Sequence, residues 1–454
     1  MVLLKSIPKV DKFISKDVFK DMSTPLISAI SKKILQELRE SILNNEIKEI
    51  NENDLIDKVI NEYQKIIEPS LQKVINATGV IVHTNLGRSL INEEAFSKVK
   101  DIVTSYNNLE YDLEKGKRGE RYSHISKVIC QTLGCEDVLI VNNNASAVFL
   151  ILNTFAKKKK VVVSRGELVE IGGSFRVPDV MSSSGAKLKE IGTTNKTHLR
   201  DYENAISEKT AMLMKVHKSN YSIEGFTNEV SHEDIVKVAQ ERNIIDYFDM
   251  GSGHIIDLPY GLDQAEPSVR KILQCNPSLV SFSGDKLLGS VQAGIIVGKK
   301  ELISKLKKNQ LLRMLRVDKI TLALLEENVK SILLGNIEQI PTLNMLFTKT
   351  SKLKENATIL KKAIEDICQC KIIETKTVIG GGTTPNKKIP SVALCIKFKN
   401  YKPNKIERLL RAKNVVGRIE NENFLLDFRT IQENEIKLVE SIIRKIIEDN
   451  EGNE

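Results

Sequence analysis

Short apolar runs alternate with helical stretches between residues 71 and 325, and this alternation restricts the fold more than any other feature. Seven runs of a few residues each end mostly in Gly, Ser, Asn or Asp: DVLIVNNN, KVVVSRG, AKLKEIG, AMLMKVH, IIDYFDMGSG, LVSFSGD and AGIIVGK. Near-continuous apolar strands separated by helices indicate a mostly parallel sheet covered on both faces. Such sheets bind ligands beyond the carboxyl ends of their strands. We therefore expect an α/β domain whose functional site lies at the polar strand ends.

The segments on either side of this region differ from it. Residues 1–70 contain no glycine and carry apolar residues at helical spacings, as in TPLISAISKKILQELRESILNNEI, which predicts a small helical domain. Residues 326–454 mix helical stretches with the strand-like runs KIIETKTVI, PSVALCIKF and ENFLLDFRTI, which predicts a small α+β domain. Within it, GGGTTPNKK at 380–388 is predicted to be a loop. We therefore predict three domains, 1–70, 71–325 and 326–454.

Composition excludes several classes of protein. No apolar run reaches the roughly 18 residues that a membrane span needs, and lysines and aspartates interrupt the start, MVLLKSIPKVDKFISKDVFK, unlike a secretory signal. The six cysteines include no CxxC pair, so we expect reduced thiols and neither disulfides nor a metal site. These features predict a cytoplasmic protein that has no membrane partner.

The net charge of +9 permits a polyanionic partner but does not require one. Residues 299–319 hold eight Lys or Arg against two Asp or Glu, and KGKRGER (115–121) and KKKK (157–160) are also basic. Residues 1–70 are balanced, with 11 basic and 12 acidic side chains. A solvated helix face or loop remains the simpler interpretation of KKKK.

One strand end suits a phosphate group. In VNNNASAVFLIL a strand leads into an apolar helix, so that Asn144, Ala145 and Ser146 lie at the helix N-terminus. Free backbone N–H groups and the helix dipole attract a phosphate there. Taken alone, an ordinary Asn or Ser helix cap is the simpler interpretation.

Two further strand ends carry an aspartate and a lysine. The segment YFDMGSG ends one strand with Asp249, which suits either a turn or a protonated ring nitrogen. The segment SFSGDK ends the next strand with Lys286, which lies three residues after Ser283. A lysine in an apolar segment is costly unless it is paired or used chemically, and its pKa is lowered. A phosphate cup that includes the Ser283 hydroxyl, an aspartate and a lysine together favour pyridoxal 5′-phosphate, with Lys286 as its Schiff-base lysine and Asp249 on its pyridinium nitrogen. A structural lysine is the alternative.

The segment MKVHKSNYSIEGF ends the strand that precedes Asp249. Asn220 in this segment suits a hydrogen bond to the phenolic oxygen of the cofactor. His217 suits ring stacking or proton transfer, and a strand-end histidine satisfied by its surroundings is an equal alternative.

The chain resembles the bacterial selenocysteine synthases, the L-seryl-tRNA(Sec) selenium transferases. The resemblance covers most of the chain in order, and the stretch around Lys286 is close to diagnostic. The matching segments are INATGVIVHTNLGRSL, NLEYDLEKGKRGER, VNNNASAV, SRGELVEIGGSFRVPDVM, EIGTTNKTH, MKVHKSNYSIEGFT, DMGSG, SFSGDKLLGSVQAGIIVGKK and LRMLRVDKITLALLE.

The resemblance implies a fold-type-I pyridoxal phosphate enzyme whose cofactor is attached to Lys286. It also implies that the N-terminal helical domain engages seryl-tRNA(Sec) and that the enzyme is a homodecamer, a pentamer of dimers. The balanced charge of residues 1–70 suggests that the RNA is recognised by shape, with other basic segments contacting phosphates. No DNA partner is expected.

The implied reaction removes the Cα proton and the β-hydroxyl of the seryl ester to give a dehydroalanyl-tRNA, to which selenium from selenophosphate adds. Lys286 is the expected base. Arg88, Arg313 and Arg316 match the family positions for binding selenophosphate, because the planar guanidinium fits phosphate oxygens. Arg313 and Arg316 are three residues apart and are expected to share a helix face, with surface helix charges as the alternative. Arg118 and Arg121 are weaker candidates for contacts with RNA phosphates or the terminal adenosine.

Two other functions compete with this interpretation. A pyridoxal phosphate lyase acting on a free amino-acid-like substrate would need an arginine clamp for the substrate carboxylate, and Arg429 in LDFRT is the candidate for one. The helical residues before VINATGV favour the tRNA enzyme. A non-catalytic tRNA-binding protein would not need the combination of Lys286, Asp249 and Ser283.

Overall fold

The computed structural model describes residues 2–171 and 175–451. The chain divides into two compact units, one that ends at Lys73 and one that comprises Val74–Glu454. Each unit has its own hydrophobic core. Among the described residues, no helix has both the length and the apolar character needed to cross a bilayer.

The first unit is helical, as predicted. Its helices are α1 (Val2–Lys5), α2 (Val10–Ile14), α3 (Thr24–Leu43) and α4 (Glu52–Ile67). Proline in the first turn starts α3, and the side chain of Asn51 caps α4 by accepting a hydrogen bond from the backbone N–H of Asn53. Phe13, Ile27 and Val59 lie in the core where the apolar faces of the helices meet.

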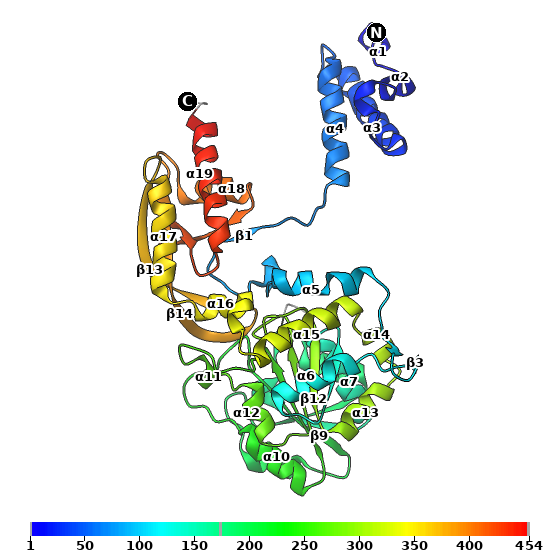
Figure 1. Cartoon of the computed structure of the whole chain (residues 1–454), viewed down its shortest axis with the longest axis vertical. Coiled ribbons are helices and arrows are strands. Elements are labelled where there is room, and N and C mark those ends of the chain that lie inside the picture. Colours follow the sequence, from blue (N-terminus) through cyan, green and yellow to red (C-terminus); the bar gives the residue numbers. More distant parts are fainter. Residues whose placement is uncertain (1, 172–174, 452–454) are drawn as a thin grey trace. The chain divides into compact units, whose positions relative to one another are not determined.

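A seven-stranded sheet forms the centre of the second unit, and it contains all seven predicted strands (Figure 1). The strand order is β4 (Asp137–Val141), β12 (Gly294–Gly298), β11 (Leu279–Ser283), β10 (Ile245–Gly251), β9 (Thr210–Val216), β5 (Lys160–Ser164) and β8 (Lys187–Ile191). Only β12 runs antiparallel to its neighbours, so the prediction of a mostly parallel sheet is confirmed.

Helices cover both faces of this sheet (Figure 1). Along β9, Met212 and Met214 belong to the core on one face, and Leu213 belongs to the core on the other. Burial on both faces explains why these strands are apolar at successive positions. The helices are α5 (Glu93–Thr104), α6 (Ser123–Leu133), α7 (Asn144–Phe155), α8 (Val177–Ser184), α9 (Leu199–Ala205), α10 (His232–Glu241), α11 (Leu262–Ala265), α12 (Val269–Gln274), α13 (Lys300–Lys308), α14 (Leu312–Leu315), α15 (Lys319–Leu333) and α16 (Pro341–Phe347).

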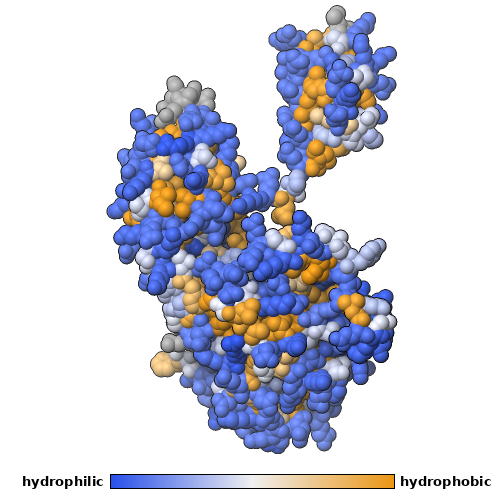
Figure 2. Space-filling view, in the orientation of Figure 1, coloured by the Kyte–Doolittle hydropathy of each residue, from blue (hydrophilic) through white to orange (hydrophobic). Residues whose placement is uncertain are grey.

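Short strand pairs connect these elements: β2 (Tyr111–Asp112) with β3 (Lys117–Arg118), and β6 (Glu170–Ile171) with β7 (Phe175–Arg176). Exposed apolar side chains on α5 and α15 include Phe96, Ile102, Ile320 and Leu333. Figure 2 shows apolar patches on the surface of this unit. Apolar side chains grouped in this way on a surface commonly mark an interaction site.

A second sheet, antiparallel, forms a smaller core near the C-terminus. Its order is β13 (Gln369–Gly380), β14 (Thr383–Lys397), β17 (Asn423–Asp427) and β16 (Arg418–Glu420), with helices α17 (Thr350–Ile364), α18 (Pro403–Arg411) and α19 (Ile436–Glu451). The loop predicted at 380–388 is wrong, because β14 already begins at Thr383. Gly380, Gly381 and Gly382 have φ values of 88°, 64° and 69°, which allow a tight turn between two long strands.

The chain does not pass from the large core to the small core at the predicted domain boundary of 325/326. That boundary falls inside α15, whose Val329 and Ile332 belong to the core of the large sheet. Conversely, Ile75 belongs to the small core, where β1 (Ile75–Asn76) pairs with β15 (Val415–Val416). The small core is therefore built from two segments that are distant in sequence.

Candidate active site

Lys286 lies in a tight turn directly after β11. Its backbone carbonyl accepts hydrogen bonds from the N–H of Gly289 (3.0 Å) and from the hydroxyl of Ser89 (2.8 Å). The residue is only 6% exposed, and among the described residues its ammonium group has no hydrogen bond or ion pair. Burial lowers the pKa of Lys286, and the positive charge of Arg88 lowers it further. A buried amine without a partner is suited to chemistry.

Asp249 lies on the strand beside the one that ends before Lys286. It faces Ser281 across the parallel pair of β10 and β11. One carboxylate oxygen accepts hydrogen bonds from the side-chain amide of Asn144 (2.7 Å) and from the N–H of Gly251 (3.2 Å). Burial raises the pKa of Asp249, while these bonds and the charge of Lys286 oppose that rise.

The expected phosphate-binding residues begin helix α7. Asn143, rather than Asn144, caps this helix by accepting a hydrogen bond from the N–H of Ser146 (2.8 Å). Asn144 instead turns its side chain towards Asp249, and Ala145 is exposed. Ser283, the last residue of β11, is buried. The helix N-terminus and the aspartate are thus joined by one hydrogen bond.

His217 and Asn220 follow β9. The backbone N–H of His217 donates to the carbonyl oxygen of Asp249 (2.9 Å), which fixes the strand end beside the aspartate. Asn220 is exposed, and its amide donates to the backbone carbonyl of Glu170 (2.8 Å). The Asn220 side chain is therefore engaged outside the buried cluster of Lys286 and Asp249.

Arg88 reaches the site from a distant part of the sequence. Its guanidinium forms an ion pair with Asp285 (2.7 Å), the residue directly before Lys286. The hydroxyl of Ser89 donates to the carbonyls of both Asp285 (2.9 Å) and Lys286. Arg88 thus supplies a partly exposed cation next to the buried lysine.

The prediction that Arg313 and Arg316 share a helix face is wrong. Helix α14 ends at Leu315, and Arg316 has an extended backbone with φ −69° and ψ 143°. Arg316 forms a β-bridge with Val141, because the chain here runs along the end of β4. Val141 lies two residues before the helix cap Asn143, so Arg316 is near the N-terminus of α7.

One carboxylate, which the sequence analysis did not single out, lies close to three arginines. Glu110 lies 2.7 Å from Arg121, 3.4 Å from Arg118 and 3.6 Å from Arg316. The hydrogen bond from Arg121 is the main cause that lowers the pKa of Glu110. Arg121 also donates to the carbonyl of Val317 (2.5 Å) and is 13% exposed, so its fork is occupied by protein groups. Arg118, at 83%, is open to solvent.

Arg429 is unsuited to clamping a substrate carboxylate. It is 1% exposed, and its guanidinium donates to the backbone carbonyls of Met345 (2.8 Å), Thr348 (2.6 Å) and Pro390. These bonds tie α16 and the chain after it to β14. Arg429 therefore has a structural role, and the feature that favoured a free amino-acid substrate is removed.

Glu266 is a further buried carboxylate near Lys286 that the sequence did not single out. It directly follows α11, accepts a hydrogen bond from the hydroxyl of Ser252, and has its carbonyl 2.8 Å from Nε2 of His254. Burial raises the pKa of Glu266 to about 8, and the charge of Lys286 partly opposes this rise. Among the described residues, its second carboxylate oxygen has no hydrogen-bond partner. No local pattern distinguishes Glu266 from the exposed Asp257, which lies before α11 in the same connection between β10 and α12.

A model of the L-seryl-tRNA selenium transferase family matches residues 74–432. The chain belongs to this family. Proteins called L-seryl-tRNA(Sec) selenium transferase from Sulfurimonas denitrificans and Aliarcobacter butzleri are 71% and 65% identical to it. The alignments cover 98% and 99% of this chain and 99% of each relative.

The fold has a solved counterpart with a different printed activity. The structure of D-glucosaminate-6-phosphate ammonia-lyase superposes with a TM-score of 0.60 at 21% identity, covering 86% of this chain and 98% of that one. At this level of identity the likeness concerns the fold alone.

The buried groups of this selenium transferase fit pyridoxal 5′-phosphate, which is its cofactor. The unpaired amine of Lys286 suits the aldehyde, and the carboxylate of Asp249 suits the ring nitrogen. The N-terminus of α7, linked to Asp249 through Asn144, suits the phosphate. The three groups come from the ends of β11, β10 and β4, as expected for a site at the carboxyl edge of the sheet.

Proposed function

We propose that this selenium transferase converts L-seryl-tRNA(Sec) to L-selenocysteinyl-tRNA(Sec), with selenophosphate as the selenium donor. The observation that carries the proposal is an unpaired buried lysine between Asp249 and Arg88 in a member of this family. The occupied guanidinium of Arg429 supports an esterified substrate, whose carboxylate needs no clamp.

Bound pyridoxal phosphate supplies an electron sink for negative charge at Cα of the seryl group. Asp249 keeps the ring nitrogen protonated, because a buried carboxylate gains from a cation beside it. Lys286, once displaced, takes the Cα proton; its lowered pKa leaves the amine neutral more often and thus able to act as a base. Glu266, on which the charge of Lys286 acts, serves as a second proton-holding group.

Arg88 and Arg316 bind the selenium donor, with Arg313 assisting from α14. Their guanidinium groups suit a small phosphate-like anion, and Arg88 stands beside the residue that precedes Lys286. Arg118 is exposed and suits a phosphate of the RNA backbone.

The helical first unit engages the tRNA, and the active form is a homodecamer, a pentamer of dimers, in the cytoplasm. The separate compact core of the unit that ends at Lys73 supports an independent recognition domain. The exposed apolar side chains of α5 and α15, among them Phe96 and Ile102, support burial against further copies of the chain. Light scattering of the holoenzyme tests the assembly, and a monomer in solution would contradict it.

The visible absorption spectrum of the purified holoenzyme tests the function. We expect a band that is absent in Lys286→Ala, and that seryl-tRNA(Sec) perturbs but free serine does not. A band that responds to free amino acids and ignores the RNA would instead favour a lyase acting on a small substrate.

A further inference from the structure

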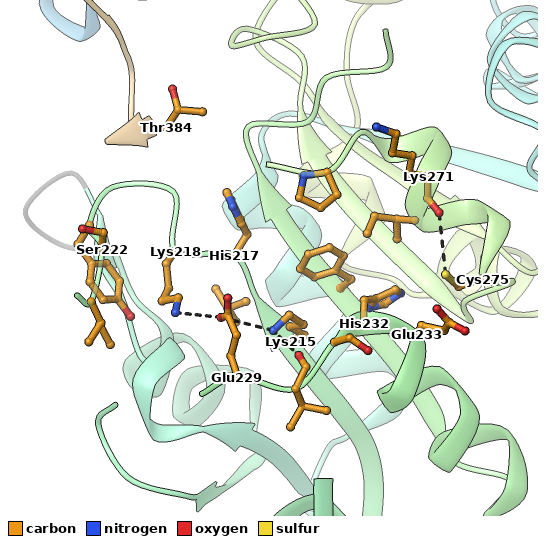
Figure 3. Close-up of a pocket in the computed structure, with 18 of the residues that line it drawn as sticks. Lys215, His217, Lys218, Ser222, Glu229, His232, Glu233, Lys271, Cys275 and Thr384 are labelled. Carbon is orange, nitrogen blue, oxygen red and sulfur yellow. Dashed lines mark hydrogen bonds and ion pairs between the residues drawn. The ribbon is translucent and has the colours of Figure 1, made fainter. Parts of the chain in front are cut away.

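A cavity of about 660 Å³ opens at the carboxyl ends of β9 and β10, outside the cluster around Lys286 (Figure 3). The chain after β9, the start of α10 and helix α12 form its walls, and Thr384 and Lys387 of β14 complete the lining. Its volume falls within the range typical of small-molecule sites. None of the groups assigned above to the cofactor or the selenium donor, apart from His217, lines this cavity.

The cavity and the Lys286 site share a wall. Val216 and His217 both line the cavity. Val216 pairs with Asp249 across the parallel strands, and the N–H of His217 donates to the carbonyl of Asp249 (2.9 Å). A ligand in the cavity is therefore separated from the cofactor's aspartate by one strand end.

The inner part of the cavity is apolar and aromatic. The rings of His232 and Phe248 stack with their centroids 4.7 Å apart. Burial lowers the pKa of His232 to about 3, so this ring is neutral. Together with Ile272, these nearly buried rings form the uncharged inner end of the cavity, and an apolar lining of this kind suits a heteroaromatic base.

The rim of the cavity carries both signs of charge. Glu229 is held by Lys218 (2.9 Å), and Lys271 and Lys387 also line the opening (Figure 3 shows the first three). A carboxylate suits ribose hydroxyl groups, and ammonium groups suit a phosphodiester. The cavity thus has an apolar inner end, and a carboxylate and several ammonium groups at its rim. This combination matches a nucleotide better than a simple anion.

We propose that this cavity holds the 3′-terminal nucleotide of the acylated tRNA, with its base at the apolar inner end beside His232 and its phosphodiester at the lysines. The inference rests on the proposed function. The seryl group is esterified directly to the ribose of this nucleotide, so the nucleotide has to lie beside the site that receives the serine. With the terminal adenosine in this cavity, Arg118 and Arg121 are not needed to contact it.

The test combines a change in the RNA with a change in the cavity. Binding of intact tRNA(Sec) and of the same RNA without its terminal adenosine is measured with the full-length holoenzyme. We expect the wild type to bind the shortened RNA about tenfold more weakly, as loss of one stacked base predicts. In Cys275→Trp, which fills the cavity from α12, the two RNAs should bind equally, and Cys275→Ala should retain the difference.

A charge reversal provides a second variant that does not depend on the fold tolerating tryptophan. Lys387→Glu should reduce the difference between the two RNAs, while Lys388→Glu, the next residue of β14 and absent from the lining, should retain it. Equal binding of both RNAs by the wild type overturns the inference and leaves the proposed function standing. Failure of the wild type to bind either RNA overturns both. If free adenosine monophosphate binds the wild type while the two RNAs bind equally, the cavity serves a free nucleotide and the inference is again overturned.

Discussion

Two buried cations in this molecule, Lys286 and Arg429, are alike in burial and opposite in their surroundings. Arg429 donates to three backbone carbonyls that belong to α16, the chain after it and β14. The ammonium group of Lys286 has no hydrogen bond within the described structure, although Asp249, Asp285 and Glu266 all act on it electrostatically. Asp285 is held by Arg88, and Asp249 by Asn144.

The difference separates a structural cation from a chemical one. Burying a charge is costly unless fixed partners compensate it, and Arg429 has such partners. At Lys286 the nearby carboxylates act on the ammonium group electrostatically, and no hydrogen bond within the described residues fixes it. The partners of a buried cation are thus a better guide to its function than burial itself.

The strongest test of this comparison places the same residue at both sites. Lys286→Met should lower the rate of selenocysteinyl-tRNA formation by about 10³-fold or more, because covalent attachment and proton transfer are both lost. In the cofactor-free form, it should raise the unfolding temperature, since an unpaired buried ammonium is removed. Turnover and thermal unfolding measure the two effects. A cofactor-free variant less stable than the wild type would show that Lys286 is held by partners after all.

Arg429→Met should have the opposite pattern. We expect a loss of about 3–5 kcal/mol in the free energy of unfolding, because three buried carbonyls lose their donor. Denaturation with urea measures the loss, and the activity per folded molecule should change little. Arg444→Met is the control, because Arg444 pairs with Asp366 on the surface of the same domain, where solvent screening leaves an ion pair little effect on stability. Equal losses of unfolding free energy in Arg429→Met and Arg444→Met would contradict a special role for the burial of Arg429.

A third cation, Arg88, lies between these extremes, since it is paired and partly exposed. Arg88→Met should raise the KM for selenophosphate about tenfold to a hundredfold, as loss of a hydrogen bond to a charged group predicts. Arg313→Met should have a smaller effect because Arg313 has no place beside Asp285. Steady-state rates at varied selenophosphate concentration measure both. An unchanged KM in Arg88→Met would restrict Arg88 to holding Asp285.

The last prediction concerns Glu266 and the dependence of stability on pH. Its native pKa of about 8 lies above the 4.5 expected of an ordinary carboxyl, so the native state keeps a proton that the unfolded chain has lost between these values. The stability of the wild type should therefore fall as pH rises through this window. Relative to Glu266→Gln, the fall should be steeper by up to ~1.4 kcal/mol per pH unit. Urea denaturation at a series of pH values measures this, and parallel profiles would contradict a protonated Glu266.

Much of the fold was predictable because its signals are local. Six of the seven sheet strands are runs of mostly buried residues, such as Val161 to Val163, whose pattern follows from contact with helices on both faces, whereas the edge strand β8 is mostly exposed. Helix α3 was predictable from its apolar spacing and its early proline. The pairing of neighbouring parallel strands also brought Asp249 and Lys286 to the same edge of the sheet.

The remaining features depend on contacts between segments far apart in the chain. Arg88 forms an ion pair with Asp285, which is 197 residues away in the sequence. Glu110 binds arginines that the sequence analysis had assigned separately to RNA or to selenophosphate. The turn of three glycines became a tight hairpin because β13 and β14 pair from Gln369 and Lys397 to Gly380 and Thr383, with one irregularity near the turn. Which carboxylates are buried, and which cations are already satisfied, follows from the packing of these segments and not from any local pattern. Residue type and spacing therefore predicted the chemistry available at the strand ends, whereas tertiary packing selected Lys286 as the amine without a partner and Arg429 as the cation with three.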